Sequence, residues 1–73
     1  METIGNRAYK EIKKRAYAND ISTSREAAKL GIHSRSLREW KENGNPSAYY
    51  LQQMHYAGYD VIYILTGERR SND

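Results

Sequence analysis

Residues 23–40 of the chain have the sequence TSREAAKLGIHSRSLREW, and this stretch decides the fold. Ala27 is small enough to let a second helix cross closely, and Gly31 suits the left-handed backbone that ends a helix. Apolar side chains that can fill the space between the two helices and the rest of the molecule follow at Ile32, Leu37 and Trp40. The spacing therefore predicts two short helices packed across a tight turn, a helix-turn-helix.

Local signals place the ends of these two helices. Thr23 and Glu26 have the spacing of a capping box, in which each side chain accepts a hydrogen bond from a backbone N–H. The first helix of the pair is therefore predicted over about residues 24–30. Ser34 is a suitable N-cap for the second helix, which is expected to end near Asn43 and Gly44.

A further helix is predicted before this pair, over about residues 6–17. Its inward face is expected at Ala8, Ile12 and Ala16, which recur at helical spacing. Its outward face is basic, and we expect it to be solvated rather than in direct contact with a partner. The basic side chains are those of Arg7, Lys10, Lys13 and Lys14.

Two more helices are predicted after the pair. One spans about residues 46–57, with Asn45 as its cap, Pro46 at its first position and Gly58 after its end. The other spans residues 60–66, capped by Asp60 and closed by Gly67. Five helices without a strand predict an all-α bundle, a single domain over residues 1–67 followed by a flexible polar tail over residues 68–73.

Composition limits the function classes. The chain has 73 residues, no cysteine and a net charge of +3, so neither disulfides nor thiolate metal sites are expected. Residues 1–43 hold ten basic and six acidic side chains, whereas Asp60 is the only charged residue of 44–67. No apolar run predicts a signal peptide or a membrane span, so we expect a soluble, cytoplasmic protein. The basic half is predicted to face a polyanionic partner.

Catalysis and cofactor binding are not expected. His33 and His55 have no cysteine and no clustered carboxylates around them in the sequence, so no metal site and no nucleophile–base pair is predicted. No glycine-rich phosphate loop occurs, and no small-molecule substrate is expected. We interpret His33, which falls in the predicted turn, as a surface histidine.

Two segments resemble the DNA-binding domains of lambda-type phage repressors and Cro proteins. LREWKENGNP, residues 37–46, looks like the end of a recognition helix and the helix after it, and DVIYILTGE, residues 60–68, is similar to the closing helix of these domains. The resemblance implies a lambda-repressor-like five-helix bundle in a regulator that binds a palindromic operator in double-stranded DNA as a homodimer. Because the chain ends at Asp73, we expect a stand-alone, Cro-like repressor. Ser24 and Arg25 stand where this family often has a glutamine.

The second helix of the pair supplies the candidates for base contacts. With Leu37 and Trp40 inward, Arg35 points most directly outward near the N-terminal end that enters the major groove, and Arg38 lies at the edge of that face. Arginine can bind guanine O6 and N7 with two hydrogen bonds. Three further candidates can reach bases or orient an arginine, although Ser34 also suits a cap: Ser34, Ser36 and Glu39.

Phosphate contacts are predicted on both sides of this helix. The candidates lie at the starts of neighbouring helices, where backbone N–H groups favour anions, or carry a hydroxyl or ammonium group. They are Thr23, Ser24, Arg25, Lys41, Asn45, Ser47 and Tyr49. The alternative is that these residues are caps and surface polar groups.

Tyrosines and the last helix indicate a dimer surface. Tyr9, Tyr17, Tyr56 and Tyr59 are predicted core or boundary residues, and Val61, Ile64 and Leu65 are predicted to face the core. A surface patch for a second copy of the chain is expected at Tyr59, Ile62 and Tyr63.

Two other interpretations compete with DNA binding. Arg35 with Glu39, and Arg38 with Glu42, have the i,i+4 spacing of ion pairs on a solvated helix face. A helical module of the same fold can also bind a protein, as an antirepressor, antitoxin or inhibitor. The two arginines favour DNA, because a protein-binding version is expected to carry apolar anchors there.

Overall fold

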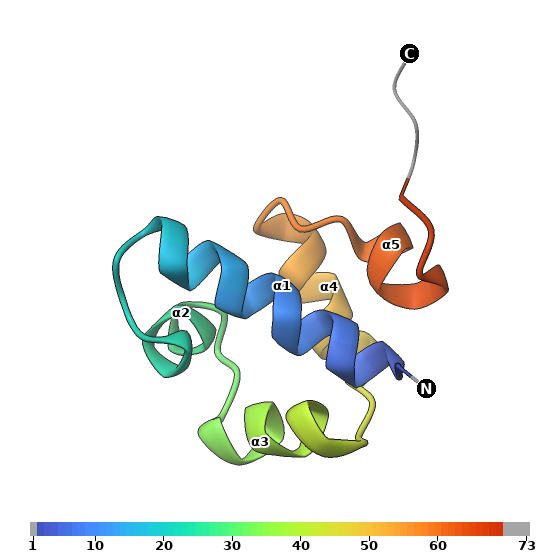
Figure 1. Cartoon of the computed structure of the whole chain (residues 1–73), viewed down its shortest axis with the longest axis horizontal. Helices are drawn as coiled ribbons and strands as arrows, with labels where there is room; N and C mark the ends of the chain where they lie inside the picture. The colour runs from blue at the N-terminus through green and yellow to red at the C-terminus, as the bar shows by residue number, and fades with distance from the viewer. Residues whose placement is uncertain (1, 70–73) are drawn as a thin grey trace.

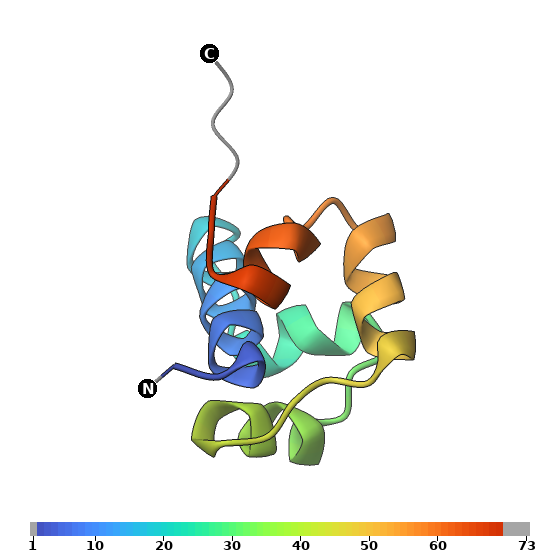
Figure 2. The same cartoon turned by 90° about the vertical axis from the view of Figure 1, so that its right-hand side faces the viewer.

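The structure is a computed structural model that describes residues 2–69. Within these residues the chain forms five helices and no strand: α1 (Ile4–Ala18), α2 (Thr23–Lys29), α3 (Ser34–Glu42), α4 (Ala48–Tyr56) and α5 (Val61–Thr66). Helix α1 crosses the middle of the molecule and packs against α2, α3 and α5, while α4 packs against α5 (Figures 1 and 2). The predicted all-α class is confirmed for the described residues.

The core lies where helical periodicity placed it. Ala8, Ile12 and Ala16 of α1 are buried, as predicted, and so is Ala27 at the crossing of α2. The other predicted core residues of the helix pair are also buried, together with two from α4 and α5: Ile32, Leu37, Trp40, Met54 and Ile64. The small residues of α1 allow three helices to approach its axis closely.

Long side chains of α1 hydrogen-bond to the ends of other helices. The Nε of Arg7 donates to the Ile64 carbonyl oxygen at 2.8 Å, and its Nη2 donates to the Leu65 carbonyl oxygen at 3.2 Å. The Nη1 of Arg15 donates to the Ala57 carbonyl oxygen at 2.7 Å. Carbonyls at a helix C-terminus lack intrahelical partners and attract cations. The prediction of a solvated Arg7 is therefore wrong, because its guanidinium caps α5.

Two predicted N-caps are displaced by a serine near them. Helix α2 is capped by Ser22, whose Oγ accepts from the Arg25 N–H at 3.1 Å, and not by Thr23. Helix α4 is capped by Ser47, and residues 44–47, with the buried Pro46, precede the helix without forming part of it. The predicted Asn45 cap is therefore wrong, because a second capping residue lay two positions further on.

Among the other predicted helix ends, the cap of α3 is wrong, whereas the cap of α5 and the glycines that follow three helices are confirmed. His33 occupies the N-cap position of α3 without a side-chain bond, so Ser34 is the first helical residue and not the predicted cap. Asp60 caps α5, as predicted, by accepting from the Tyr63 N–H at 3.0 Å. The left-handed backbone predicted at Gly31 is confirmed, and the predicted helix ends at Gly58 and Gly67 also have positive φ.

Glu26, predicted to complete a capping box, is instead buried. Its Oε1 accepts from the Asn19 Nδ2 at 3.1 Å and lies 3.6 Å from the Lys29 ammonium. The carboxylate thus joins the end of α1 to α2. None of the helices in residues 2–69 is long and apolar enough to cross a membrane.

Arg69, in the predicted polar tail, contacts the body of the protein. The Nη2 of Arg69 lies 2.8 Å from Glu11 Oε2, and its guanidinium stacks 3.9 Å from the centre of the Tyr63 ring. The tail prediction for residues 70–73 lies outside the described residues.

Candidate nucleic-acid interface

Helix α3 presents polar and charged side chains to solvent. Leu37 and Trp40 hold its inner face on the core, and the ring of Trp40 makes an edge contact with Tyr50, their centroids 5.5 Å apart. Of the predicted base-contact residues, Ser36 is half-buried and the other four are exposed. The exposed four are Ser34, Arg35, Arg38 and Glu39.

A hollow of about 200 Å³ lies beside α3, where α1, α2 and α3 meet. We call it the α2–α3 groove. Its polar lining comes from the start of α2 and from one side of α3, with Tyr9 of α1 and Leu37 as the remaining walls. These polar residues are Thr23, Ser24, Ser34, Arg38 and Lys41. The lining thus contains two cations, three hydroxyls on α2 and α3, and no carboxylate.

The groove brings together residues that were predicted for different roles. Ser34 and Arg38 were candidates for base contacts, and Thr23, Ser24 and Lys41 were candidates for phosphate contacts. The outward residues Arg35 and Glu39 do not line it. The structure therefore separates the two arginines: Arg38 faces the groove, and Arg35 stands on the first turn of α3 outside it.

Arg38 and Lys41, the cations of the groove, form no ion pair with the acidic side chains that the structure describes. Among residues 2–69, no ion pair joins Arg35 with Glu39 or Arg38 with Glu42, and none involves Lys41. The Lys41 ammonium lies 5.9 Å from the centre of the Tyr9 ring, within the range of a cation–π interaction. The i,i+4 ion pairs expected for a solvated face are therefore not formed, and the groove is suited to an anion.

The remaining phosphate candidates lie apart from the groove. Arg25 is exposed on α2, Asn45 is exposed in the segment before α4, and Ser47 is engaged as the cap of α4. The Tyr49 ring is 60% exposed and contacts Tyr50 edge to face. The structure brings none of these four into the groove lining.

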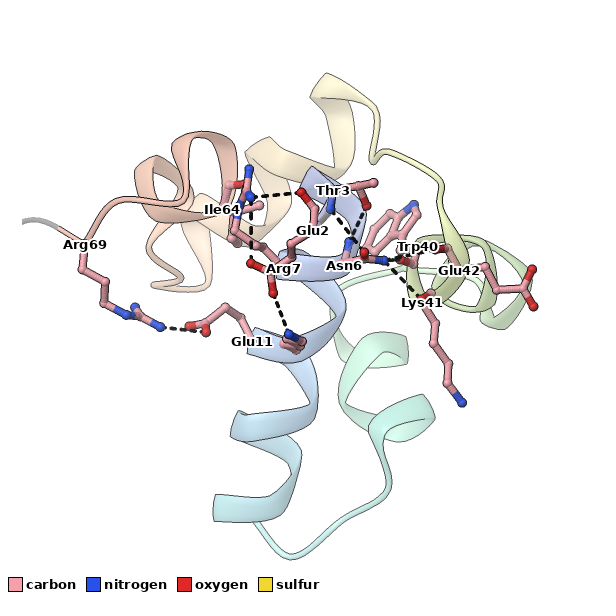
Figure 3. Close-up of polar contacts among 11 residues, drawn as sticks. Glu2, Thr3, Asn6, Arg7, Glu11, Trp40, Lys41, Glu42, Ile64 and Arg69 are labelled. Carbon is pink, nitrogen blue, oxygen red and sulfur yellow. Dashed lines mark hydrogen bonds and ion pairs between the residues drawn. The ribbon is translucent and has the colours of Figure 1, made fainter.

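Sequence reasoning missed two residues that hold α3 in place. The Nδ2 of Asn6 donates to the carbonyl oxygens of Trp40 at 2.8 Å, Lys41 at 3.1 Å and Glu42 at 3.3 Å (Figure 3). Gly5 packs directly on the same helix end, since a Cβ there would overlap the Gly44 carbonyl oxygen. One sequence signal could have drawn attention to Asn6, because Thr3 and Asn6 have the spacing of a capping box. This capping box begins α1 at Ile4, earlier than predicted.

The predicted dimer patch is altered by the burial of Tyr59. Its ring is 6% exposed and lies under the Arg15 guanidinium, 3.6 Å from it, so Tyr59 is wrong as a surface contact. Ile62 is 48% exposed and Tyr63 is half-buried. Leu65, predicted to face the core, is 41% exposed, whereas Ile64 is fully buried and Val61 packs against the core, as predicted. The exposed apolar residues of α5 are therefore Ile62 and Leu65.

Burial also changes the chemistry of Tyr59. Removal from water raises the pKa of the Tyr59 hydroxyl to about 12, and the nearby carboxylates of Glu26 and Glu11 act in the same direction, while Arg15 opposes them. The hydroxyl has no hydrogen-bond partner among the described residues. The predicted core position of Tyr59 is confirmed, whereas Tyr17 and Tyr56 are 88% and 72% exposed, outside the predicted core.

A larger hollow, of about 350 Å³, lies between α1 and the turn before α5. Its lining includes both signs of charge: Glu11, Lys14, Arg15 and Asp60. Glu11 and Asp60 are paired with Arg69, so their charge is already compensated. Although larger, this hollow contains no predicted nucleic-acid contact, and we place the candidate site in the α2–α3 groove.

Within the described residues, no group of three or more histidine or acidic side chains is placed to hold a metal ion. Comparison of the chain with protein-family models, with curated proteins and with solved structures gave no match. The resemblance to phage repressors therefore stays a prediction.

Proposed function

We propose that this chain is a sequence-specific DNA-binding regulator, a Cro-like repressor of phage or prophage type that acts by binding and not by catalysis. In this proposal α2 and α3 form the helix-turn-helix, and α3 enters the major groove of an operator. The observation that carries it is the α2–α3 groove, in which Arg38 and Lys41 form no ion pair with an acidic side chain of the described residues.

Phosphate binding explains the composition of the groove. Phosphate oxygens accept hydrogen bonds from arginine, lysine, serine and threonine without regard to base sequence. Arg38, Lys41 and the hydroxyls of Thr23, Ser24 and Ser34 offer these donors from two helices. Such contacts fix the position of a protein on the duplex, so we assign the groove to one stretch of DNA backbone.

Base contacts are assigned to the outer face of α3. Arg35 is exposed on the first turn, outside the groove, and forms no ion pair within residues 2–69. Arg35 is therefore our first candidate for a contact with a guanine base. Arg38, at the edge between the groove and the outer face, is the second. Glu39 is exposed beside Arg35 and can accept from cytosine N4 or orient the arginine.

Binding of a palindromic operator needs two copies of the chain. The exposed Ile62 and Leu65 on α5, with the half-buried Tyr63, supply an apolar surface for a two-fold dimer. Dimers place two recognition helices about 34 Å apart, one helical turn of DNA.

A salt titration tests the central claim. We expect the affinity for bulk duplex DNA to fall steeply as salt rises, because each neutralised phosphate releases counterions. Selection of bound fragments from a randomised duplex pool then tests sequence preference. Affinity that does not change with salt contradicts phosphate binding, and an unenriched pool contradicts sequence-specific recognition.

A protein-binding module is the second candidate, and one observation favours it. Helix α4 exposes Tyr49 and Tyr56 at 60% and 72%, and the segment 44–67 carries no charge except Asp60. Tyrosine is enriched in protein interfaces. Salt-independent binding of a protein partner together with no binding of duplex DNA would favour this candidate.

A further inference from the structure

The first turn of α1 and the last turn of α3 are joined by one side chain. Asn6 uses its two polar atoms for different helices: its Oδ1 accepts from the Thr3 N–H at 3.2 Å, and its Nδ2 donates to three carbonyl oxygens of α3. Its own backbone N–H donates to the Thr3 hydroxyl at 3.0 Å. The two bonds between Asn6 and Thr3 form the capping box of α1, and only the Nδ2 of Asn6 reaches α3 (Figure 3).

The Nδ2 of Asn6 binds where α3 most needs a donor. The last carbonyls of a helix have no partner within the helix, and here the oxygens of Trp40, Lys41 and Glu42 converge on one amide group. Beside it, Gly5 packs against Gly44 with no room for a Cβ. The C-terminal end of α3 is therefore fixed to α1 at two consecutive residues.

The same end of α3 carries part of the α2–α3 groove. Lys41 accepts the Asn6 hydrogen bond at its carbonyl and holds its ammonium over Tyr9, which also belongs to α1. Arg38 lies three residues earlier and lines the same groove. A change in the tilt of α3 therefore moves both cations relative to the hydroxyls of α2, and moves Arg35 at the opposite end.

We propose that Asn6 is a positioning residue that sets the orientation of α3 and, through it, the discrimination between DNA sequences. The inference rests on the proposed function and deepens it. Asn6 itself is half-buried and lies outside the groove lining, so its effect on DNA passes through α3.

The variant Asn6→Asp separates the two roles of this side chain. A carboxylate can still accept from Thr3 N–H, but it has no hydrogen to donate and repels the carbonyls of α3. Thr3→Ala is the matched control, because it removes the acceptor for Asn6 N–H and leaves the amide donor to α3 in place. Trp40 is the only tryptophan and lies on α3, so its fluorescence reports the seating of this helix.

The probes are a duplex selected by the wild type from a randomised pool and sonicated bulk duplex DNA. For Asn6→Asp we expect the affinity for the selected duplex to fall at least about fivefold. A loss of this size corresponds to one lost base contact. We expect a much smaller loss on bulk DNA and a changed Trp40 emission in the free protein. Thr3→Ala should retain the wild-type ratio of the two affinities and the wild-type emission.

Two outcomes overturn the inference while leaving DNA binding intact. One is that Asn6→Asp keeps the wild-type ratio of the affinities for the selected and the bulk duplex. The other is that this ratio changes equally in Asn6→Asp and Thr3→Ala, which indicates a purely structural role. If Asn6→Asp does not fold, Asn6→Ala takes its place, and the same comparison with Thr3→Ala decides. A wild type that binds neither duplex overturns the proposed function instead.

Discussion

Gly5 leaves no room for a side chain, because the backbone of α3 and of the residues directly after it occupies that space. A Cβ on Gly5 would overlap the Gly44 carbonyl oxygen and lie 3.0 Å from the Trp40 Cα, so neither neighbour is a flexible side chain. The contact joins residues far apart in the sequence, and no local pattern marks it. The other glycines follow predicted helices and could be explained as helix ends, whereas Gly5 could not.

Gly5→Ala is therefore expected to lower the free energy of unfolding by about 1–3 kcal/mol, the usual cost of forcing a methyl group into a packed contact. Urea unfolding followed by circular dichroism measures it. Lys13→Ala, on the exposed face of α1, is the control and is expected to change stability by less than about 0.5 kcal/mol. Equal stability of Gly5→Ala and the wild type would contradict the close approach of α1 and α3.

Tyr59 gives a second prediction for a single residue. Because folding raises the pKa of its hydroxyl from 10.0 to about 12, the unfolded chain loses this proton first, and stability falls as pH rises between these values. The decrease in the free energy of unfolding is expected to approach about 2 kcal/mol near pH 12. It is measured by urea unfolding of the wild type and Tyr59→Phe across this range.

The phenylalanine variant isolates the contribution of Tyr59 from other groups that titrate at high pH. It also removes a buried hydroxyl that has no partner among the described residues, so at neutral pH it should be at least as stable as the wild type. A wild type and a Tyr59→Phe variant that lose stability in parallel above pH 10 would contradict the raised pKa.

At the scale of elements, periodicity predicted the helices and their inner faces, while the caps depended on the tertiary structure. Ala8, Ile12, Leu37 and Trp40 are buried as their spacing indicates, because one helix face must meet the core. At the start of α2, two adjacent residues can cap the helix, and the earlier one, Ser22, follows a turn that contains Asp20 at φ 58°.

The candidate site was predictable in part for the same reason. The exposed face of α3 follows from its buried face, but the groove requires α1, α2 and α3 to be placed together. The sequence therefore proposed Arg38 and Lys41 separately, and Asn6, which is 34 residues from Trp40, produces no periodic signal.

Helix α3 provides a prediction that separates base contacts from phosphate contacts. Arg35→Ala is expected to weaken binding to a selected duplex by about 1–3 kcal/mol and to relax sequence preference. Lys41→Ala is expected to weaken selected and bulk DNA alike and to reduce the salt slope by about 1. Fluorescence anisotropy at several salt concentrations measures both, with Lys13→Ala as the control outside the groove. Equal losses on both duplexes for Arg35→Ala would contradict its proposed contact with a base.

Across the whole molecule, charge and apolar surface are divided between two halves. Residues 1–43 carry most of the charge, and residues 44–67 carry only Asp60. The α2–α3 groove belongs to the first half, and the exposed Ile62 and Leu65 belong to the second. In the proposed function, one part of the surface binds a polyanion and the other a second copy of the chain.

Ile62→Glu is expected to shift the proposed dimer to the monomer, because two carboxylates would be buried at a two-fold interface. Analytical ultracentrifugation measures the change, and affinity for the selected duplex should fall with it. Tyr56→Glu, on the exposed face of α4, is the control and should leave the oligomeric state unchanged. Dimerisation that survives Ile62→Glu would place the interface elsewhere.

The hydrogen bonds from α1 also constrain the order in which the domain can form during synthesis. They join residues 34, 42 and 58 positions apart, from Asn6 to Trp40, from Arg15 to Ala57 and from Arg7 to Leu65. On the ribosome, the first helix emerges long before the carbonyls that its donors will bind. The acceptors emerge in the order Trp40, Ala57 and Leu65, so the Arg7 guanidinium is the last of these groups to find its partner, and the native arrangement is completed only after Leu65 has left the exit tunnel.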